Sequence, residues 1–410
     1  MVPATLSLRC PFVEILDPKW VDEATVFVSH AYSYRVADSF EVMLRYEESH
    51  GGSYYWFDPF SLNQHSDGGV VETEVLEQAF GESIRAIGAT LIVSSPWDNP
   101  CFLNRAWCLF ELMSSVNVGV PVEIVLPRAE EVLFVNALRE DWKVVYKALA
   151  EIDSRKAQAK EAKDLEAIHR AVERSVTHAG LNKLVNQQLR EWLIEMAKKE
   201  LLRLAQCGDE SELSEFQLSA SVMMLQLGHL VEGEEVARAC VELTDRLFGI
   251  QDSKALRAAS RLGSILQAQG KLSEAEPLYQ RALAGREETL GPNHPDTLAS
   301  VNNLAVLLKA QGKLSEAEPL YQRALAGREE TLGPNHPQTL TSVNNLAGLL
   351  QAQGKLSEAE PLYQRALTGC EETLGPNHPQ TLASVDNLAV LLKAQGKLSE
   401  AEPRSLPSCS

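Results

Sequence analysis

Residues 270–311 read GKLSEAEPLYQRALAGREETLGPNHPDTLASVNNLAVLLKAQ, and nearly the same 42-residue pattern returns from Gly312, Gly354 and Gly396 onward. A unit of this length is too short to bury a core alone, so it must stack on its neighbours. Stacked units present an extended concave surface. The repeats therefore predict an array that binds a partner, and they indicate no chemistry.

Each unit has the pattern of two amphipathic helices. Over residues 297–310 apolar residues recur three and four positions apart, and Gly312 follows as a left-handed terminator. The second helix is predicted to begin at the capping-box spacing of residues 315–318, with Pro319 close to its first turn, where a missing N–H matters least. It ends at Gly333, because the Gly-Pro pair there cannot continue a helix.

The repeat motifs are NNLA at 302–305, QGK at 311–313 and EAEPLYQRAL at 316–325. They resemble tetratricopeptide repeats of the kinesin-light-chain type, with a divergent copy around Gly228 that suits an end unit. The resemblance implies an all-α solenoid whose first helices line an inner groove.

That groove is expected to hold a protein or an extended peptide, because amide side chains both donate and accept hydrogen bonds. The alternative is that the asparagines only tie neighbouring helices together. The candidate contacts all stand on the predicted first helices: Asn302, Asn303, Lys309, Asn344, Asn345, Gln351, Asn387 and Lys393.

Histidines recur as well, each in a Pro-Asn-His-Pro turn: His294, His336 and His378. Stacked helices lie roughly 8–10 Å apart and each unit adds two of them, so these imidazoles cannot share an ion whose ligands lie about 2 Å away. We interpret them as turn residues and predict no metal site.

The amino-terminal part alternates strand-like and helical patterns. Short β-prone runs stand at 24–29, 54–58, 90–94 and 122–126, with helical patterns between them. Such alternation predicts an α/β domain with a parallel sheet covered on both faces. Ligands of these folds bind beyond the carboxyl ends of the strands. Neither a dinucleotide-binding nor a P-loop glycine motif is present.

Four segments of this domain resemble a Toll/interleukin-1 receptor (TIR) domain of the plant type: FVSH at 27–30, LEQAFGESIRAIGATLIVSSPW at 76–97, RAWCLFEL at 105–112 and VEIVLP at 122–127. The resemblance implies a flavodoxin-like fold and self-association. In TIR domains that hydrolyse NAD a glutamate at the place of Glu111 is catalytic. The sequence departs from the family in longer loops at 59–69 and 100–105.

The resemblance makes NAD a candidate substrate, and no cofactor is otherwise implied. A carboxylate at Glu111 would stabilise the positive charge that develops on the ribose as nicotinamide leaves. Ser29, His30, Asp58 and Trp107 are the expected binding residues. The structural alternatives are a solvated Glu111 and a Trp107 that packs in the core.

The composition indicates which classes of partner the protein can bind and in which compartment it is located. The net charge of −18 argues against nucleic acid and anionic lipid, so neutral or basic partners are favoured. Seven cysteines without a C-x-x-C pair indicate reduced thiols and a cytoplasmic location. No apolar run of about 20 residues predicts a membrane span, and no signal peptide is expected.

We divide the chain into a leader (1–22), the TIR-like domain (23–127), a helical connector (128–205), the repeat array (206–403) and a tail (404–410). The last repeat departs from the pattern at Arg404, which predicts a frayed end or a longer chain.

Two functions stay open. One is an intracellular signalling scaffold that binds a partner through its repeats and hydrolyses NAD through a self-associating TIR-like domain. The other is a non-enzymatic adaptor that binds protein cargo as kinesin light chains do. The heptad region expected ahead of kinesin-light-chain repeats is missing, which favours the first.

Overall fold

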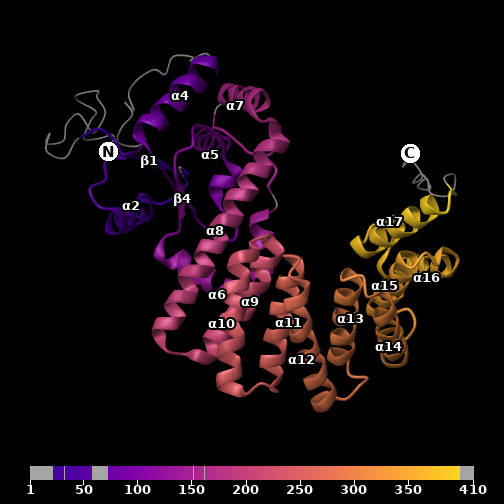
Figure 1. Ribbon diagram of the computed structural model, residues 1–410. Coiled ribbons are helices and arrows are strands. Elements are labelled where there is room, and N and C mark those ends of the chain that lie inside the picture. Colours follow the sequence, from indigo (N-terminus) through magenta and orange to yellow (C-terminus); the bar gives the residue numbers. More distant parts are fainter. Residues whose placement is uncertain (1–21, 32, 58–72, 151, 161, 398–410) are drawn as a thin grey trace, which may run out of the picture. The chain divides into compact units, whose positions relative to one another are not determined.

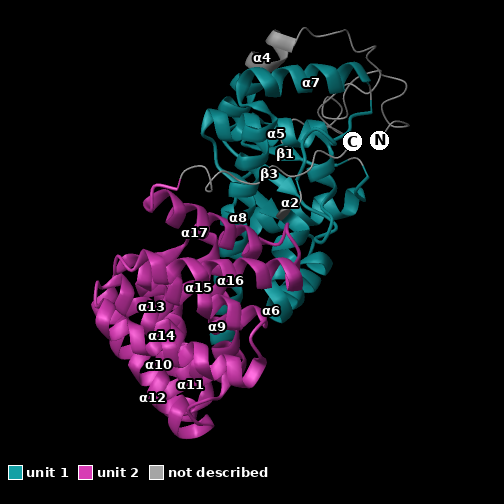
Figure 2. Ribbon diagram, turned by 90° about the vertical axis from the view of Figure 1, so that its right-hand side faces the viewer, with its two compact units in different colours: residues 1–207 teal, residues 208–410 magenta. Residues whose placement is uncertain are grey.

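The computed structural model describes residues 22–31, 33–57, 73–150, 152–160 and 162–397 (Figure 1). Asp58, the 59–69 loop, the amino-terminal leader and the 404–410 tail therefore lie outside the described residues. The chain divides into two compact units, residues 1–207 and 208–410 (Figure 2).

The first unit holds a parallel sheet with the strand order β2-β1-β3-β4. Every residue of β1 and β3 is buried, as expected for inner strands whose two faces are both covered. The predicted parallel sheet is confirmed, with strands somewhat shorter than expected. Their bounds are β1 Val26–Ser29, β2 Tyr55–Trp56, β3 Thr90–Val93 and β4 Val122–Val125.

Helices join these strands and continue beyond the last one. The helix between β3 and β4, α5, is buried along most of its length because it is apolar on almost every side. Three helices, α6, α7 and α8, follow β4 where the sequence predicted a helical segment. The buried carboxylate of Glu200 on α8 joins α6 and α8, because it is bonded to Arg139 of α6 as well as to Arg203. The helix bounds are α2 Val36–His50, α4 Thr73–Ile87, α5 Ala106–Val118, α6 Arg128–Ala150, α7 Ala162–Ser175 and α8 Thr177–Cys207.

The second unit is a run of antiparallel helix pairs. The first helices are α9 Glu210–Leu227, α11 Ser253–Ala268, α13 Pro295–Ala310, α15 Pro337–Ala352 and α17 Pro379–Ala394. The second helices are α10 Leu230–Phe248, α12 Leu272–Leu290, α14 Leu314–Leu332 and α16 Leu356–Leu374. The two-helix division of each repeat is thus confirmed.

The first helices form the inner layer of this unit. Three of the four neighbouring pairs in the layer touch directly, α9 with α11, α13 with α15 and α15 with α17, and α11 with α13 is the exception. No successive pair of the described second helices packs to the same extent. The more closely spaced layer of a curved solenoid lies on the inside of the curve. We therefore call the exposed side of the first helices the inner face.

The helix ends follow local rules, with two corrections. Gly312 has a φ of 79°, which confirms the left-handed stop. The second helix of the same unit begins at Leu314 with Lys313 as an N-cap that makes no side-chain bond, so the predicted capping box is wrong. Pro319 lies within the helix and not in its first turn. Packing of the helix against its neighbours outweighs this lost N–H.

The recurrent histidines are helix caps. His294 Nδ1 accepts the backbone N–H of Asp296 at 3.2 Å, and His336 and His378 make the same bond to the residue two positions on. Each imidazole satisfies one of the unpaired N–H groups at the start of a first helix. The turn assignment is confirmed, and the capping role is new.

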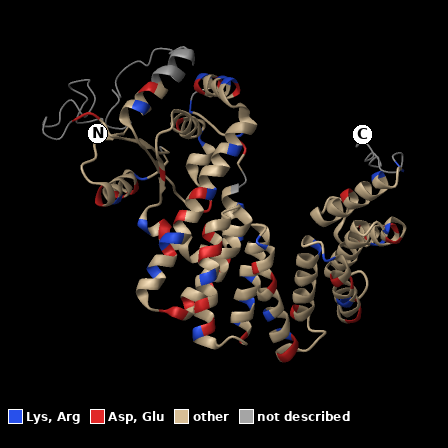
Figure 3. Cartoon of the chain, viewed as in Figure 1, with Lys and Arg blue, Asp and Glu red and all other residues tan. Residues whose placement is uncertain are grey.

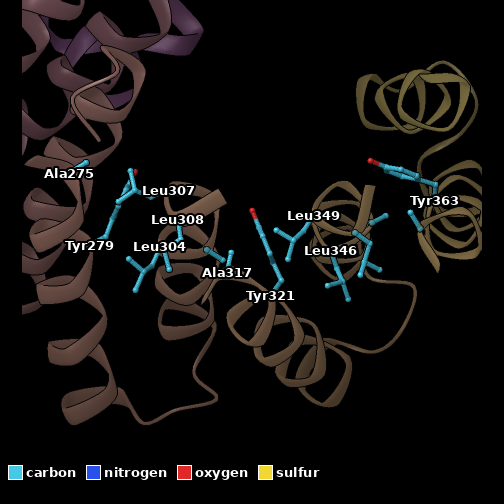
Figure 4. Close-up of a cluster of buried hydrophobic side chains, with 14 of the residues drawn as sticks. Ala275, Tyr279, Leu304, Leu307, Leu308, Ala317, Tyr321, Leu346, Leu349 and Tyr363 are labelled. Atoms are coloured by element: carbon cyan, nitrogen blue, oxygen red, sulfur yellow. The ribbon is translucent and has the colours of Figure 1, made fainter. Parts of the chain in front are cut away.

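Tyrosines and leucines form the core between the pairs. Figure 4 shows Tyr279 directed toward Leu304 and Leu307, and Tyr321 toward Leu346 and Leu349 of the following unit. These side chains are nearly inaccessible, with Tyr321 1% exposed. Each unit therefore buries its core largely against its neighbour.

Gly327 marks the closest approach of α14 to α13. A methyl group there would lie 2.7 Å from Cδ2 of Leu298, which is fully buried. We predict that Gly327→Ala lowers the free energy of unfolding by about 1–3 kcal/mol, because the packed side chains around Leu298 cannot move enough to make room for a methyl group. This steric cost outweighs the higher helix propensity of alanine. Denaturant unfolding measures the change. Ala326→Thr, at an exposed neighbour, should shift stability by less than about 0.5 kcal/mol, and an equal loss for both variants would contradict the packing argument.

Charged residues of both signs are mixed along the helices of this unit (Figure 3). Some of them form a ladder between successive second helices: Lys313 Nζ lies 2.9 Å from Glu276, and Lys355 Nζ lies 3.3 Å from Glu318. A glutamine of each unit, Gln311 or Gln353, donates to the same carboxylate. These hydrogen bonds, from the glutamine first and then the lysine, lower the pKa of Glu276 and Glu318.

The ladder predicts acid sensitivity. A carboxyl whose pKa is lower in the folded chain than in the unfolded chain stabilises the fold above the unfolded pKa, and this contribution is lost as the pH falls from there through the lowered pKa of the folded chain. Thermal unfolding between pH 5 and 2.5 should therefore depend less on pH in Glu276→Gln/Glu318→Gln, with at most about 1 kcal/mol per pair because the pairs lie at the surface. The control is Glu316→Gln, because Glu316 is exposed and forms no ion pair with the described residues. The same dependence of stability on pH in the wild type, the double variant and the control would refute the contribution of the ladder.

Candidate functional site

The asparagines of the inner face link neighbouring first helices. Asn345 Nδ2 donates to Asn302 Oδ1 at 2.9 Å, and Asn344 Nδ2 donates to Ser384 Oγ at 2.7 Å. These bonds join α13 to α15 and α15 to α17. The interpretation that some asparagines tie helices together therefore applies to three of the candidates.

The Asn345–Asn302 bond still leaves hydrogen-bonding capacity. It uses one N–H of Asn345 and the oxygen of Asn302, so the Asn302 amide hydrogens and the Asn345 oxygen face other partners. Asn303 and Asn387, at the position equivalent to Asn345, make no hydrogen bond within the described residues. The inner face thus carries both donors and acceptors at one repeated position.

The other inner-face candidates differ in their surroundings. Gln351 Oε1 accepts the hydroxyl proton of Tyr363 at 3.0 Å. Lys309 is half-buried, and burial lowers the pKa of its ammonium group. Lys393 is exposed on α17. All the predicted contacts from Asn302 to Lys393 lie on first helices, as the repeat pattern predicted.

A second group of polar residues lies where the sheet order changes direction. The strands on the two sides of β1 are β2 and β3, so the carboxyl ends of β1 and β3 lie at the topological switch point of this sheet. Ser29 is the last residue of β1, and His30 follows it. Ser29 and His30 therefore fall at the carboxyl end of a parallel strand beside the switch point, where such sheets commonly bind ligands.

Glu111 reaches this place from α5. Its Oε2 accepts the hydroxyl proton of Ser29 at 2.5 Å, and the residue is 8% exposed. The hypothesis of a solvated helix glutamate is therefore wrong: α5 is central in the unit and buries this face. A carboxylate held by a hydroxyl at a strand end has a defined orientation.

His30 stays neutral near pH 7. Burial lowers its pKa to about 4, the bond with the Val28 backbone opposes that change, and the nearby Arg105 lowers it further. Its ring lies 4.5 Å from the ring of Phe57. A neutral imidazole in this position can donate or accept a hydrogen bond but brings no charge.

The remaining candidates of this unit pack against other side chains. Trp107 is half-buried and meets Phe110 edge-on, with 6.0 Å between ring centroids, which supports core packing. Cys108 is buried and its Sγ contacts the His30 carbonyl oxygen at 3.5 Å. Asp58 lies outside the described residues.

Sequence reasoning missed Tyr34. Its hydroxyl oxygen accepts the backbone N–H groups of Ser95 and Phe102, both at 3.2 Å, and so holds the segment between β3 and α5 in place. Burial raises the pKa of this phenol. No sequence signal marks it, because its partners are backbone groups more than 60 residues away.

Comparison with known families bears on the helical unit. The family model of the tetratricopeptide repeat matches residues 254–330, 299–372 and 338–404. This part of the chain is an array of tetratricopeptide repeats. The repeats of this family form protein-interaction scaffolds, and the predicted type of the array is confirmed.

The tetratricopeptide array resembles repeats of the kinesin-light-chain type in sequence. A putative kinesin light chain of Podosopora anserina with nearly identical TPR-like repeats is 30% identical, with a TM-score of 0.41; the match covers 45% of this chain and 88% of that one. BtubC (BKLC) from P. vanneervenii is 24% identical over 52% of this chain and 87% of that one, with a TM-score of 0.45.

A Rap protein complexed with a competence and sporulation factor is 15% identical over 73% of this chain and 88% of that one, with a TM-score of 0.39. No curated protein matches the chain. Among the described residues, no helix combines the length and apolar character that a membrane crossing requires, and no cluster of three or more metal-ligating side chains occurs.

Proposed function

We propose that the tetratricopeptide array is a scaffold that binds an extended peptide, or an extended segment of a protein, along its inner face. The observation that supports this most directly is the repeated amide position. Asn303, Asn345 and Asn387 stand 42 residues apart on successive first helices, and α15 and α17 pack directly against each other. Neighbouring packed helices lie about 8–10 Å apart, which is close to three residues of an extended chain.

An extended segment has unpaired N–H and C=O groups along its length. Amide side chains can bind both kinds of group, whatever the side chains of the segment are. The bond between Asn345 and Asn302 holds two of these amides in fixed orientations, so little side-chain entropy is lost when a ligand binds. These two amides are therefore preorganised to bind the backbone of an extended segment.

The test begins with dodecapeptides selected from a random phage-displayed library against the full chain. Asn303→Ala/Asn387→Ala removes two amides that make no bond within the described part of the chain, so the fold should keep its stability. We expect the affinity for the selected peptides to fall about tenfold, the equivalent of about 1.4 kcal/mol for two hydrogen bonds. Fluorescence anisotropy measures it.

The matched control is Gln280→Ala/Gln322→Ala, which removes two exposed amides from second helices α12 and α14. This variant should bind like the wild-type chain. Equal affinities of the Asn303/Asn387 variant and the wild type would exclude the inner face as the binding site, and a failure to select any peptide would contradict the scaffold function itself.

We also propose a second activity, the hydrolysis of NAD to nicotinamide and ADP-ribose, at the switch point of the sheet in the first unit. It rests on the resemblance to a TIR domain and on the place of Glu111, whose buried carboxylate is oriented by Ser29 at the carboxyl end of β1. As the bond from ribose to nicotinamide breaks, a carboxylate there would stabilise the oxocarbenium-like sugar until water attacks it. Self-association of these domains would belong to the same activity.

Nicotinamide release from NAD, followed at several protein concentrations, tests this proposal. Glu111→Gln keeps an oxygen that accepts the Ser29 hydroxyl proton but removes the charge, so we expect release to fall at least 100-fold with little change in stability. Glu123→Gln, on edge strand β4, should leave the rate unchanged. Absence of turnover by the wild-type chain at every concentration would leave the alternative, a non-enzymatic adaptor that binds protein cargo through the array.

A further inference from the structure

Two histidines of the first unit are hydrogen-bonded to each other. His169 Nδ1 on α7 lies 2.8 Å from His178 Nε2 at the start of α8, with 4.7 Å between the ring centroids. The other ring nitrogen of His178, Nδ1, lies 2.8 Å from Ser154 Oγ. His178 and Ser154 are 6% and 3% exposed, and His169 is half-buried. None of these three residues belongs to either candidate site.

The contact between the rings limits the charge that they can carry. A hydrogen bond between two imidazole nitrogens needs one N–H group and one unprotonated nitrogen, so a single proton lies between the rings. The pair can be neutral, or it can carry one positive charge if a further proton binds to an outer nitrogen. If both rings are cationic, two N–H groups face each other at 2.8 Å and the bond is lost. Repulsion between two charges that are shielded from water adds to this loss.

The surroundings of His178 also disfavour its charged form. Burial lowers the pKa of His178 most, and His169 and Arg155 lower it further, whereas Glu173 and Asp153 oppose the change. Glu173 Oε1 lies 3.8 Å from His178 Nε2, but its side chain is 56% exposed, so water screens its attraction. The start of α8 adds the positive end of a helix dipole.

The other elements packed against α7 add no compensating charge. Its neighbours are α4, α5 and α8. The single charged residue of α5 is Glu111, which belongs to the candidate site of the sheet. Glu82 and Arg85 of α4 and Lys183 of α8 are exposed. Among the described residues, Glu173 is therefore the only carboxylate within ion-pair distance of the two imidazoles.

Ser154 connects the histidine pair to the start of α5. It belongs to the segment 152–160, which lies between α6 and α7. Further along this segment, the Gln158 N–H donates to the Asn104 carbonyl oxygen at 2.9 Å, and the Gln158 carbonyl oxygen accepts the N–H of Ala106 at 3.0 Å. Ala106 is the first residue of α5, so Gln158 satisfies one of the N–H groups that a helix start leaves unpaired.

The junction between α7 and α8 is under backbone strain. Thr177, the first residue of α8, has a φ of 63°, a conformation that a β-branched residue rarely adopts. Such strain persists only while the surrounding contacts hold it. The bonds of the adjacent His178 ring are among these contacts. Their loss would therefore favour a rearrangement of the junction.

We propose that the His169–His178 pair is a proton-sensitive latch, which holds the segment 152–160 against the start of α5 at neutral pH and releases it in acid. When both rings are charged, the His178 side chain turns toward water and Ser154 loses its partner on α8. The segment then opens, and the bonds between Gln158 and the start of α5 are lost. Since α5 also carries Glu111, the latch acts on the helix of this candidate site whether or not the site is catalytic.

The direction of the pH effect follows from the lowered pKa of His178. A histidine whose pKa is lower in the folded chain contributes its full stability above the unfolded pKa, about 6.5. This contribution is lost as the pH falls from there toward the folded value. Opening of the segment should therefore begin below about pH 6.5 and increase with further acidification.

Hydrogen–deuterium exchange of the full chain tests the latch, with mass spectrometry at about pH 7.5 and about pH 5 and correction for intrinsic exchange rates. Peptides that cover 152–160 and 101–108 should lose about tenfold in protection at the lower pH, the effect of one pKa unit. Peptides from the inner repeats should keep their protection and provide the internal reference.

Two variants remove one of the two charges. In His169→Asn the amide offers an uncharged donor and acceptor near the position of the histidine Nδ1, so the bond to His178 survives in acid. His178→Gln removes the charge from the other ring. In both variants the protection of 152–160 should no longer depend on pH. The control is His336→Asn, the same substitution at a helix cap of the array, where asparagine also caps well; it should show the wild-type change.

Equal protection of 152–160 in the wild type at both pH values would overturn the latch. An equal loss of protection in the wild type and in both variants would overturn it as well, because the acid sensitivity would then have another origin. If 152–160 opens in acid while 101–108 keeps its protection, the connection to α5 is refuted. None of these outcomes depends on NAD hydrolysis or on peptide binding by the array.

Discussion

The burial of each repeat's tyrosine and leucines against the following repeat is the interaction on which the second unit depends. Tyr321 is 1% exposed only because the first helix of the next unit, with Leu346 and Leu349, covers it. A 42-residue unit alone would leave this face in water. Within a repeat, Gly327 lets α14 pack closely against α13, where a methyl group would meet Leu298. The array is therefore stabilised by the contacts between successive repeats and not by one central core.

That constraint separates the two sides of the array. On the second helices, lysines, glutamines and glutamates of successive units pair in a regular ladder, so their charges are already compensated. On the inner face the pairing is incomplete. The bond from Asn345 to Asn302 uses only one donor and one acceptor of the two amides, and Lys309 has no acidic partner within the described residues. Hydrogen-bonding capacity that folding leaves unused is available for binding. This contrast is the physical basis for the proposed scaffold.

The first unit is organised by a different rule. Its parallel strands are buried on both faces, so polar groups can collect only where the strands end. Ser29 and Glu111 meet there because α5 passes next to the carboxyl end of β1. The bond between them orients a carboxylate at the switch point of the sheet. Such a site is compatible with the proposed hydrolysis of NAD and with a purely structural hydrogen bond. The Glu111→Gln variant distinguishes the two roles, because it keeps the hydrogen bond and removes the charge.

The sequence by itself determined the helix pairs, the glycine terminators, the parallel sheet and the face that the candidate residues share, because these follow from local periodicity and from residues within one turn of each other. It misplaced the start of the second helix, and it left open whether Glu111 is a catalytic residue or one that water solvates. Only the tertiary structure decided which polar side chains are already paired. Asn345 is tied to Asn302, Glu111 to Ser29 and Lys313 to Glu276, and these partners stand 43, 82 and 37 residues apart. Lys309 and Lys393 stand in nearly identical local sequences, but Lys309 is half-buried next to Gly348 of the following first helix, whereas no first helix follows Lys393 within the described residues. Pairing and burial arise from contacts between segments that are distant in the sequence, so a local sequence pattern cannot predict them.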